Sequence, residues 1–258
     1  MAEEIICKVR ESCSGKGLEC HPFKVQWYND KVQSIFHLPY DPNTLAVLII
    51  SCPSMFELLF QPYLCSADYR PGQLDPLDQC IKDEMTRMKE DLFSQHAVDM
   101  IQDFELRPGS RRPKVLVQTA GHIAGAARYY QRSDVDPDPW DGDEKIFGVS
   151  VHPKYGGWFA LRGIMVFKDV LAPELVQREP ADCVPSREMR IELLEKFNQC
   201  WKDWSYRDVI ATTVEEKYSK EQREYFATEP GLRSGLIDTL RLNHQQGSCK
   251  LNPTGSCP

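Results

Sequence analysis

The stretch Trp158-Phe159-Ala160-Leu161-Arg162-Gly163-Ile164-Met165-Val166-Phe167 decides the fold. Its short apolar run predicts a buried strand, which we expect over residues 157–167. A second apolar run, residues 45–52, predicts another central strand. Arg162 interrupts the first run, and burying a cation is unfavourable unless an opposite charge accompanies it. An arginine inside a buried strand therefore indicates a binding site at the sheet.

A second segment, residues 115–131, places a histidine among small side chains. Residues 114–118 predict a strand, and residues 120–131 are compatible with a helix. The small residues around His122 would let a flat group approach the backbone, although they would equally serve close packing of a helix on a sheet. Together with Arg162, this segment indicates a pocket for a large ligand that bears negative groups.

Strands concentrate in the middle of the chain and helices at its C-terminal end, which indicates an α+β fold. Asp75-Pro76 predicts the start of a helix that runs to about residue 94, and Ser186 predicts the cap of another that runs to about residue 201. Residues 153–156 predict a hairpin turn between strands at 146–152 and 157–167. We also expect strands at 23–27 and 98–106, helices at the N-terminus and at 54–59, 214–225 and 232–240, and a single domain over 1–242 with a disordered tail over 243–258.

The composition is that of a globular protein, with 258 residues, 41% hydrophobic and 27% charged. The formal net charge of -7 disfavours nonspecific binding to nucleic acid, and we interpret the basic residues at 107–114 as a solvated loop. No apolar run is long enough to span a bilayer, and the N-terminus resembles neither a secretory nor a transit peptide. These features predict a cytoplasmic location.

The ten cysteines do not form a recognisable metal or disulfide pattern. There is no Cys-x-x-Cys, and no Cys/His cluster has the spacing of a zinc site. A cytosolic setting keeps thiols reduced. We therefore expect free thiols and no metal ligands.

Five further blocks, rich in Trp, Pro and His, accompany the two segments in nearly collinear order from about residue 20 to about residue 235. On these residues the chain closely resembles the CblC family, the cytosolic cobalamin-processing proteins of animals. The blocks are Cys20-His-Pro-Phe-Lys-Val-Gln-Trp-Tyr-Asn29, Phe36-His-Leu-Pro39, Asp75-Pro-Leu-Asp-Gln-Cys80, Asp182-Cys-Val-Pro185 and Trp201-Lys-Asp-Trp-Ser-Tyr-Arg-Asp208.

The resemblance implies a fold like that of flavin-dependent nitroreductases, with a central antiparallel sheet flanked by helices. It implies removal of the upper axial ligand of cobalamins, which are bound base-off. Cyanocobalamin would lose cyanide by reduction through FMN or FAD, and alkylcobalamins would lose their alkyl group to the thiolate of glutathione. It also implies a CblD-type adaptor as protein partner, with the chain itself a monomer or a weak homodimer.

The resemblance assigns cobalamin contacts to two stretches and several single residues. Small residues beside His122 would leave room for the macrocycle. We expect His122 to donate a hydrogen bond to the corrin or its nucleotide, not to ligate cobalt, because Ala120 stands where the histidine-on cobalamin motif needs an acid; a satisfied core histidine is the alternative. The matching residues are Asp103, Val115, Leu116, Val117, Gln118, His122, Tyr129, Tyr130, Gln131, Ser150 and Leu161.

Three arginines match the family's glutathione-binding positions: Arg162, Arg207 and Arg233. Glutathione carries two carboxylates, which guanidinium groups bind at two points, and nearby positive charge favours the reactive thiolate. For each arginine the alternative is a structural ion pair, and for Arg207 the neighbouring Asp203 and Asp208 make the two interpretations close.

Two positions depart from the family pattern. Ser150 replaces a residue that can be cysteine in relatives, which removes a thiol from the site, and the bulky Phe147 is expected to crowd one rim of the corrin pocket. Two other functions stay open at this stage. One is a cobalamin chaperone without turnover, and the other is a nitroreductase-like flavoenzyme, although the only glycine-rich candidate, residues 14–17, is a weak signal.

Overall fold

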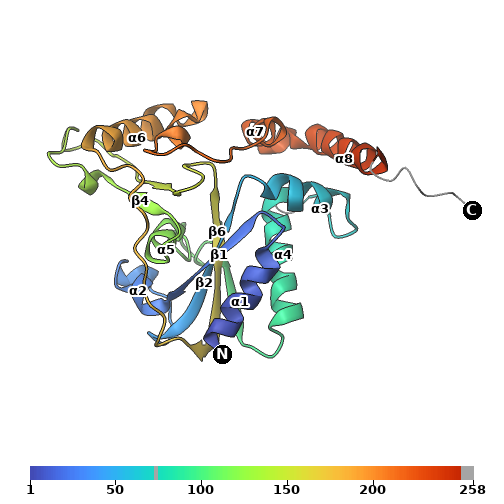
Figure 1. Cartoon of the computed structure of the whole chain (residues 1–258), viewed down its shortest axis with the longest axis horizontal. Helices are drawn as coiled ribbons and strands as arrows, with labels where there is room; N and C mark the ends of the chain where they lie inside the picture. The colour runs from blue at the N-terminus through green and yellow to red at the C-terminus, as the bar shows by residue number, and fades with distance from the viewer. Residues whose placement is uncertain (73–74, 251–258) are drawn as a thin grey trace, which may run out of the picture.

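A four-stranded antiparallel sheet lies at the centre of the molecule, in the order β1-β2-β6-β3 (Figure 1). The computed structural model describes residues 1–72 and 75–250, with side chains described as far as residue 244. The two apolar runs of the sequence form the central pair of strands, as predicted. The strands are β1 (Leu18–Lys24), β2 (Thr44–Ser51), β3 (Val98–Gln102) and β6 (Ala160–Leu171).

Strand β2 is buried along its whole length because helices cover both faces of the sheet. Leu45, Val47 and Ile49 pack in one core with α1 (Ala2–Cys13) and α4 (Pro76–Leu92). The alternating residues, Ala46, Leu48 and Ile50, pack in a second core with α2 (Val25–Asn29) and α5 (Val117–Ile123). Figure 1 shows these two pairs of helices on opposite sides of the sheet. A strand buried on both faces is apolar at every position, which explains the continuous run in the sequence.

Two helix starts follow the sequence prediction closely. The Asp75 side chain accepts a hydrogen bond from the Leu77 N–H at 3.0 Å at the start of α4. The Ser186 hydroxyl accepts one from the Met189 N–H at 3.2 Å at the start of α6 (Arg187–Cys200). Both are N-caps, which satisfy free N–H groups of the first turn. The remaining longer helices are the π-helix Phe56–Phe60, α3 (Gln61–Cys65), α7 (Lys220–Ala227) and α8 (Arg233–Lys250).

The predicted turn at 153–156 forms, with His152 and Gly156 bonded across it, but the predicted pairing of strands at 146–152 and 157–167 is wrong. Strand β5 (Val149–Val151) pairs with β4 (Arg128–Tyr130) in a separate two-stranded sheet, whereas β6 belongs to the central sheet. The helix predicted at 120–131 ends at Ile123, because the residues that follow form a turn and then strand β4, which pairs with β5. Gly125 turns the chain with φ +72°, and a Cβ there would meet the Arg178 carbonyl oxygen at 2.6 Å. The chain then enters β4, which packs with β5 and α6 in a third core.

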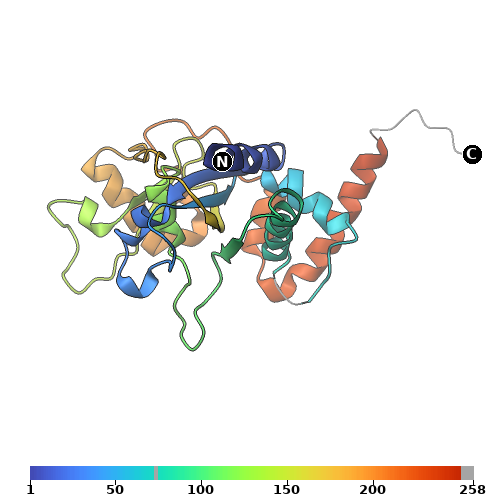
Figure 2. The ribbon, with the colours of Figure 1, turned by 90° about the horizontal axis from the view of Figure 1, so that it is seen from below.

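Smaller differences lie at the two ends of the chain. The strand predicted at 23–27 is β1 followed by helix α2. Helix α8 runs to Lys250, so residues 243–250 are helical where the sequence predicts disorder, and residues 251–258 of the predicted tail lie outside the described residues. Within the described part of the chain, no helix is long and apolar enough to cross a membrane. Figure 2 shows the loop between β3 and α5, which holds the basic residues 107–114, projecting from the molecule.

Candidate functional site

Residues 115–118, predicted as a strand, instead lead into helix α5. Val115 is buried, and the Leu116 N–H donates to the Tyr28 hydroxyl at 2.9 Å, so a side chain satisfies the group that a neighbouring strand would bind. Tertiary contacts therefore override the β-propensity of this short stretch. Leu116 and Val117 stay half-buried and Gln118 is exposed, which leaves the start of α5 accessible to a ligand.

Helix α5 packs directly on β6, and this contact joins two of the predicted cobalamin segments. A Cβ on Gly121 would meet the Leu161 Cδ2 atom at 2.9 Å, so the helix and the strand approach closely at this point. Asp103 follows β3 at the same end of the sheet, and its N–H donates to the Arg162 carbonyl at 3.2 Å. The structure thus brings together Asp103, Leu161 and the α5 segment.

The Asp103 carboxyl is the acid at this site with the most altered titration. Burial raises the pKa of Asp103 to about 6, and the charge of Arg162 offsets only part of this effect. A carboxyl with this pKa is partly protonated just below neutral pH, and the protonated form can donate a hydrogen bond as well as accept one.

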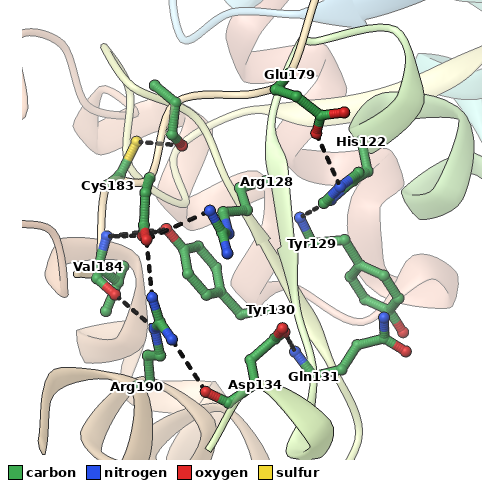
Figure 3. Close-up of polar contacts among 12 residues, drawn as sticks. His122, Arg128, Tyr129, Tyr130, Gln131, Asp134, Glu179, Cys183, Val184 and Arg190 are labelled. Carbon is green, nitrogen blue, oxygen red and sulfur yellow. Dashed lines mark hydrogen bonds and ion pairs between the residues drawn. The ribbon is translucent and has the colours of Figure 1, made fainter. Parts of the chain in front are cut away.

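The backbone of strand β4 holds the His122 ring in place, as Figure 3 shows. Its Nδ1 accepts a hydrogen bond from the Tyr129 N–H at 3.2 Å, and its Nε2 lies 4.0 Å from the Glu179 carboxylate. Burial lowers the pKa of His122, so the ring is neutral at pH 7. A neutral ring whose Nδ1 accepts carries its proton on Nε2. It therefore offers a donor to a ligand, which supports the prediction that His122 does not ligate cobalt.

Strand β4 divides the three residues predicted as a second contact set. Successive side chains of a strand point to opposite faces. Tyr129 and Gln131 line a cavity of about 540 Å³, whereas the Tyr130 side chain is fully buried on the other face. The Tyr130 hydroxyl donates to Asp182 at 2.7 Å and accepts the Val184 N–H at 2.9 Å (Figure 3). The Tyr130 side chain therefore does not face the cavity, and only the backbone of this residue can contact a ligand there.

Of the two positions that depart from the family pattern, Phe147 lines the same cavity and Ser150 pairs with the cavity residue Tyr129. Ser150 lies opposite Tyr129 on β5, and its hydroxyl is buried without a hydrogen-bond partner among the described residues. Phe147 lines the cavity with 56% of its surface exposed. The Asn198 side chain fixes the Phe147 backbone, accepting its N–H at 2.9 Å and donating to its carbonyl at 3.0 Å. The bulky ring is thus held at the rim.

A larger cavity, of about 950 Å³, lies elsewhere, between α1, β1 and residues 171–178. It contains none of the matched cobalamin or glutathione residues, although Ala124 and Gly125, two of the small residues beside His122, line it. We place the candidate site at the smaller cavity, because Tyr129 and Gln131 line it and the unpartnered Ser150 hydroxyl lies on the strand that pairs with Tyr129. A corrinoid would extend beyond this cavity toward Asp103 and Leu161.

Arg162 is buried, with 6% of its surface exposed. Its Nε donates to the Ser51 hydroxyl at 2.8 Å, and no described carboxylate lies within ion-pair distance of its guanidinium. Asp78 and Asp103 are near enough for its charge to lower their pKa values, although burial raises both overall. A buried guanidinium without a direct carboxylate partner is suited to receive one from a ligand.

Arg207 lies in a cage of four aromatic rings. Its guanidinium carbon is 5.1–5.6 Å from the ring centroids, and it donates to the Gly157 carbonyl. Neither neighbouring acid pairs with it: Asp208 accepts from Trp158 Nε1 at 2.7 Å and pairs with Lys217 at 2.8 Å, while Asp203 caps the Ser205 N–H at 2.8 Å. The ion-pair alternative therefore fails for Arg207. The four rings belong to Trp158, Trp204, Tyr206 and Tyr218.

Arg233 is the one arginine of the three with a carboxylate partner among the described residues. It forms an ion pair with Asp75, its Nε donates to the Thr228 carbonyl at 2.9 Å, and it lies 4.5 Å from the Tyr225 ring centroid. The charges of Arg162 and Arg233 both act on Asp78, so these two arginines flank the start of α4. For Arg233 the structure shows the ion pair that the sequence left as the alternative.

A partly buried polar centre around Glu19 lies outside the predictions. Glu19 on β1 accepts from the Tyr155 hydroxyl at 2.7 Å and the Cys52 thiol at 3.3 Å. The Nε2 atoms of His21 and His152 lie 3.4 and 3.6 Å from its other oxygen. Burial opposes ionisation, but the hydrogen bonds from His152, His21 and Tyr155 outweigh it and lower the pKa of Glu19 well below its usual range. In the sequence, this centre is indicated only by the spacing of Glu19 and His21, which places both side chains on one face of a strand.

Glu19, His21 and His152 hold their ligand atoms within 4.8 Å of one another, the arrangement of a metal site. However, His152 Nδ1 accepts the N–H groups of Lys154 at 3.1 Å and Tyr155 at 3.3 Å, so its proton is on Nε2 and faces Glu19. A metal-bound histidine needs the opposite arrangement, with its free nitrogen as donor. We therefore interpret the centre as structural. It fixes the turn that leads to Gly157, the partner of Arg207.

The comparisons with known proteins cover nearly the whole chain. A family model described as the methylmalonic aciduria and homocystinuria type C family matches residues 17–237. The chain is 48% identical over 242 residues to the Gallus gallus cyanocobalamin reductase / alkylcobalamin dealkylase, covering 94% of this chain and 99% of that protein. It is 46% identical over 245 residues to the Homo sapiens protein of the same name, covering 95% and 85%.

The fold agrees as well. The crystal structure of a Caenorhabditis elegans B12-trafficking protein CblC, a human MMACHC homologue, superposes with a TM-score of 0.81 at 33% identity, covering 93% of this chain and 95% of that chain. Sequence and structure thus confirm the resemblance, and the chain belongs to the methylmalonic aciduria and homocystinuria type C family.

Proposed function

We propose that this protein removes the upper axial ligand of incoming cobalamins, by reductive decyanation of cyanocobalamin and by glutathione-dependent dealkylation of alkylcobalamins. One observation carries the proposal. The chain is 48% identical to the Gallus gallus protein over 94% of its own length and 99% of that relative, whose name gives both activities. Identity of this level over nearly the whole of both sequences supports a shared reaction as well as a shared fold.

The corrin would bind base-off along the accessible start of α5, between Leu161 and strand β4. Tyr129 and Gln131 would face it from β4, with the Nε2–H of His122 as a donor beside them. Asp103, whose pKa burial raises to about 6, would bond a corrin side-chain amide from the end of the central sheet. The small side chains of α5 would let the macrocycle approach the backbone closely.

The thiol would enter from the side of the arginines. Arg162 and Arg207, neither of which pairs with a described carboxylate, would hold the carboxylates of glutathione. Their charge would also favour the thiolate. The thiolate sulfur attacks the alkyl carbon, a carbon–sulfur bond forms, and the carbon–cobalt bond breaks with its electron pair left on cobalt. The products are the S-alkyl thioether and cob(I)alamin.

For cyanocobalamin, reduced FMN or FAD would supply electrons to the bound substrate. The antiparallel sheet with helices on both faces is compatible with a nitroreductase-like fold, and we propose this finer class for it. We also propose a cytoplasmic location, a single cobalamin-processing domain, a monomer or weak homodimer, and a CblD-type adaptor that receives the product.

The deciding experiment mixes the purified protein with methylcobalamin and excess glutathione without oxygen. We expect S-methylglutathione to form over many turnovers, with a change in the corrin absorption spectrum. A protein that binds methylcobalamin base-off but yields no thioether would refute the dealkylase.

A carrier without turnover is the second candidate, favoured by the description of the Caenorhabditis elegans structure as a trafficking protein. The two candidates differ in stoichiometry. A carrier changes the corrin spectrum upon binding and forms no thioether, whereas an enzyme forms more thioether than there is protein. A purified protein coloured by tightly bound flavin, inactive on both cobalamins, would instead indicate an unrelated flavoenzyme.

A further inference from the structure

Asp75 makes three separate contacts with its two carboxylate oxygens. Oδ1 accepts the Leu77 N–H at 3.0 Å, as the N-cap of α4, and also accepts the Tyr225 hydroxyl at 2.9 Å. Oδ2 pairs with Arg233, and the two side chains are only 21% and 11% exposed. One oxygen therefore serves the fold of α4, and the other serves the arginine.

The three arginines of the proposed thiol site differ in this respect. Arg162 donates to a hydroxyl and Arg207 to a backbone carbonyl, and both are neutral acceptors. Arg233 alone is already neutralised, by a carboxylate of the chain itself. A ligand carboxylate that is to bind Arg233 competes with Asp75 for the charge of the guanidinium, whose Nη1 already donates to Asp75 and whose Nε donates to the Thr228 carbonyl.

We propose that Asp75 is a built-in competitor of the thiol substrate, which sets the affinity of the site for carboxylate-bearing thiols. This inference rests on the proposed function. In the absence of the thiol, the Asp75 carboxylate holds Arg233 against the start of α4. When glutathione binds, one of its carboxylates takes the place of Asp75, while Oδ1 keeps the helix cap and the bond from Tyr225.

The competitor adds selectivity. A thiol without a carboxylate cannot replace Asp75 and gains nothing from Arg233. A thiol with a carboxylate exchanges one ion pair for another, so its binding is weaker than three unopposed arginines would give. Asp75 thus lowers the affinity for glutathione without touching the reacting atoms, and it acts through Arg233 as a positioning residue.

The chain allows a clean test through Asp75→Asn. Asparagine is as good an N-cap as aspartate, and its Oδ1 can keep the bonds from Leu77 and Tyr225. Its amide NH₂ would then face Arg233, donor against donor, and would release the guanidinium. We expect the KM for glutathione in methylcobalamin dealkylation to fall about three- to tenfold, the range of a charge-assisted hydrogen bond in partial exposure. The kcat and the methylcobalamin affinity should stay the same.

Two controls accompany the variant. With 2-mercaptoethanol, a neutral thiol, the kinetics of Asp75→Asn should match those of the unaltered protein. Asp169→Asn makes the same change of charge at the end of β6 that lies away from Arg162, where Asp169 pairs with His96 at 2.9 Å. This variant should leave the KM for glutathione unchanged. A fall in KM shared by Asp169→Asn would refute a local effect.

An unchanged or increased KM for glutathione in a folded Asp75→Asn would refute the competitor. If this variant does not fold, Asp75→Ser, which retains a capping hydroxyl and removes the carboxylate, gives the same readout. Failure of the proposed function is recognised separately, since the unaltered protein would then form no thioether with either thiol.

Discussion

Replacing Asp103 with asparagine should stabilise the protein at neutral pH, because Asp103 ionises at a cost in the folded state. Burial raises its pKa to about 6 from an ordinary value of 3.8. One pKa unit corresponds to about 1.4 kcal/mol, so this difference corresponds to at most about 3 kcal/mol of stability. Well below pH 3.8 the carboxyl is protonated in both the folded and unfolded states, and no cost arises. As the pH rises from 3.8 toward 6, the unfolded state ionises while the folded state stays protonated, so the folded state loses stability, and the loss levels off above pH 6.

The assay is urea unfolding of the unaltered protein and of Asp103→Asn at several values between pH 4 and pH 8. The variant lacks the titrating group, so the free energy of unfolding of the unaltered protein should fall relative to it by about 2–3 kcal/mol over this range. Most of the change should lie between pH 4 and pH 7. A difference between the two proteins that does not vary with pH would refute the reasoning. A difference that grows in the opposite direction would mean that Arg162 dominates over burial.

Three further substitutions test the site and its support. Arg162→Gln keeps a donor for neighbouring hydroxyls but removes the charge. The KM for glutathione in steady-state kinetics should therefore rise at least about tenfold, while the methylcobalamin affinity in spectral titration is largely retained. An equal loss of glutathione use and of methylcobalamin affinity would make Arg162 structural. Gly125→Ala places a Cβ 2.6 Å from the Arg178 carbonyl oxygen at positive φ, and should lower the free energy of unfolding by about 1–3 kcal/mol in urea titration, whereas an unaffected midpoint would contradict the close approach. Ser186→Ala removes the bond to the Met189 N–H and should destabilise α6 by about 1 kcal/mol in thermal unfolding, with Ser186→Asn as the control that restores the cap.

Local signals predicted the parts of the fold that depend on few residues. The continuous apolar runs predicted β2 and β6, because these strands are buried on both faces. Asp75 and Ser186 predicted two helix starts, because an N-cap acts on N–H groups two or three residues away. The family could be predicted because the chain carries long blocks rich in Trp, Gly, Pro and His. The collinear order of these blocks is far more specific than any single motif.

Contacts across the chain decided what the sequence could not. The Tyr28 hydroxyl accepts the N–H of Leu116, so the stretch predicted as a strand leads into helix α5 instead. Strand β5 pairs with β4. This pairing is possible only because the helix predicted at 120–131 ends before β4 begins. The alternation of β4 buried the Tyr130 side chain while Tyr129 faces the cavity. The partner of Arg233 is an acid far away in the sequence, which no local pattern around either residue indicates.

The strand order has a consequence for how the protein is made. Strands β1 and β2 pair as sequence neighbours, but the other edge of β2 bonds to β6, with Leu48 opposite Ile164. During synthesis, β1 and β2 leave the ribosome long before β6 exists. Throughout that interval a strand that is apolar over residues 45–50 keeps one edge unpaired, which is a template for aggregation. We therefore expect the nascent chain to need chaperone protection until residues beyond 160 emerge, and chains that stop before β6 to aggregate.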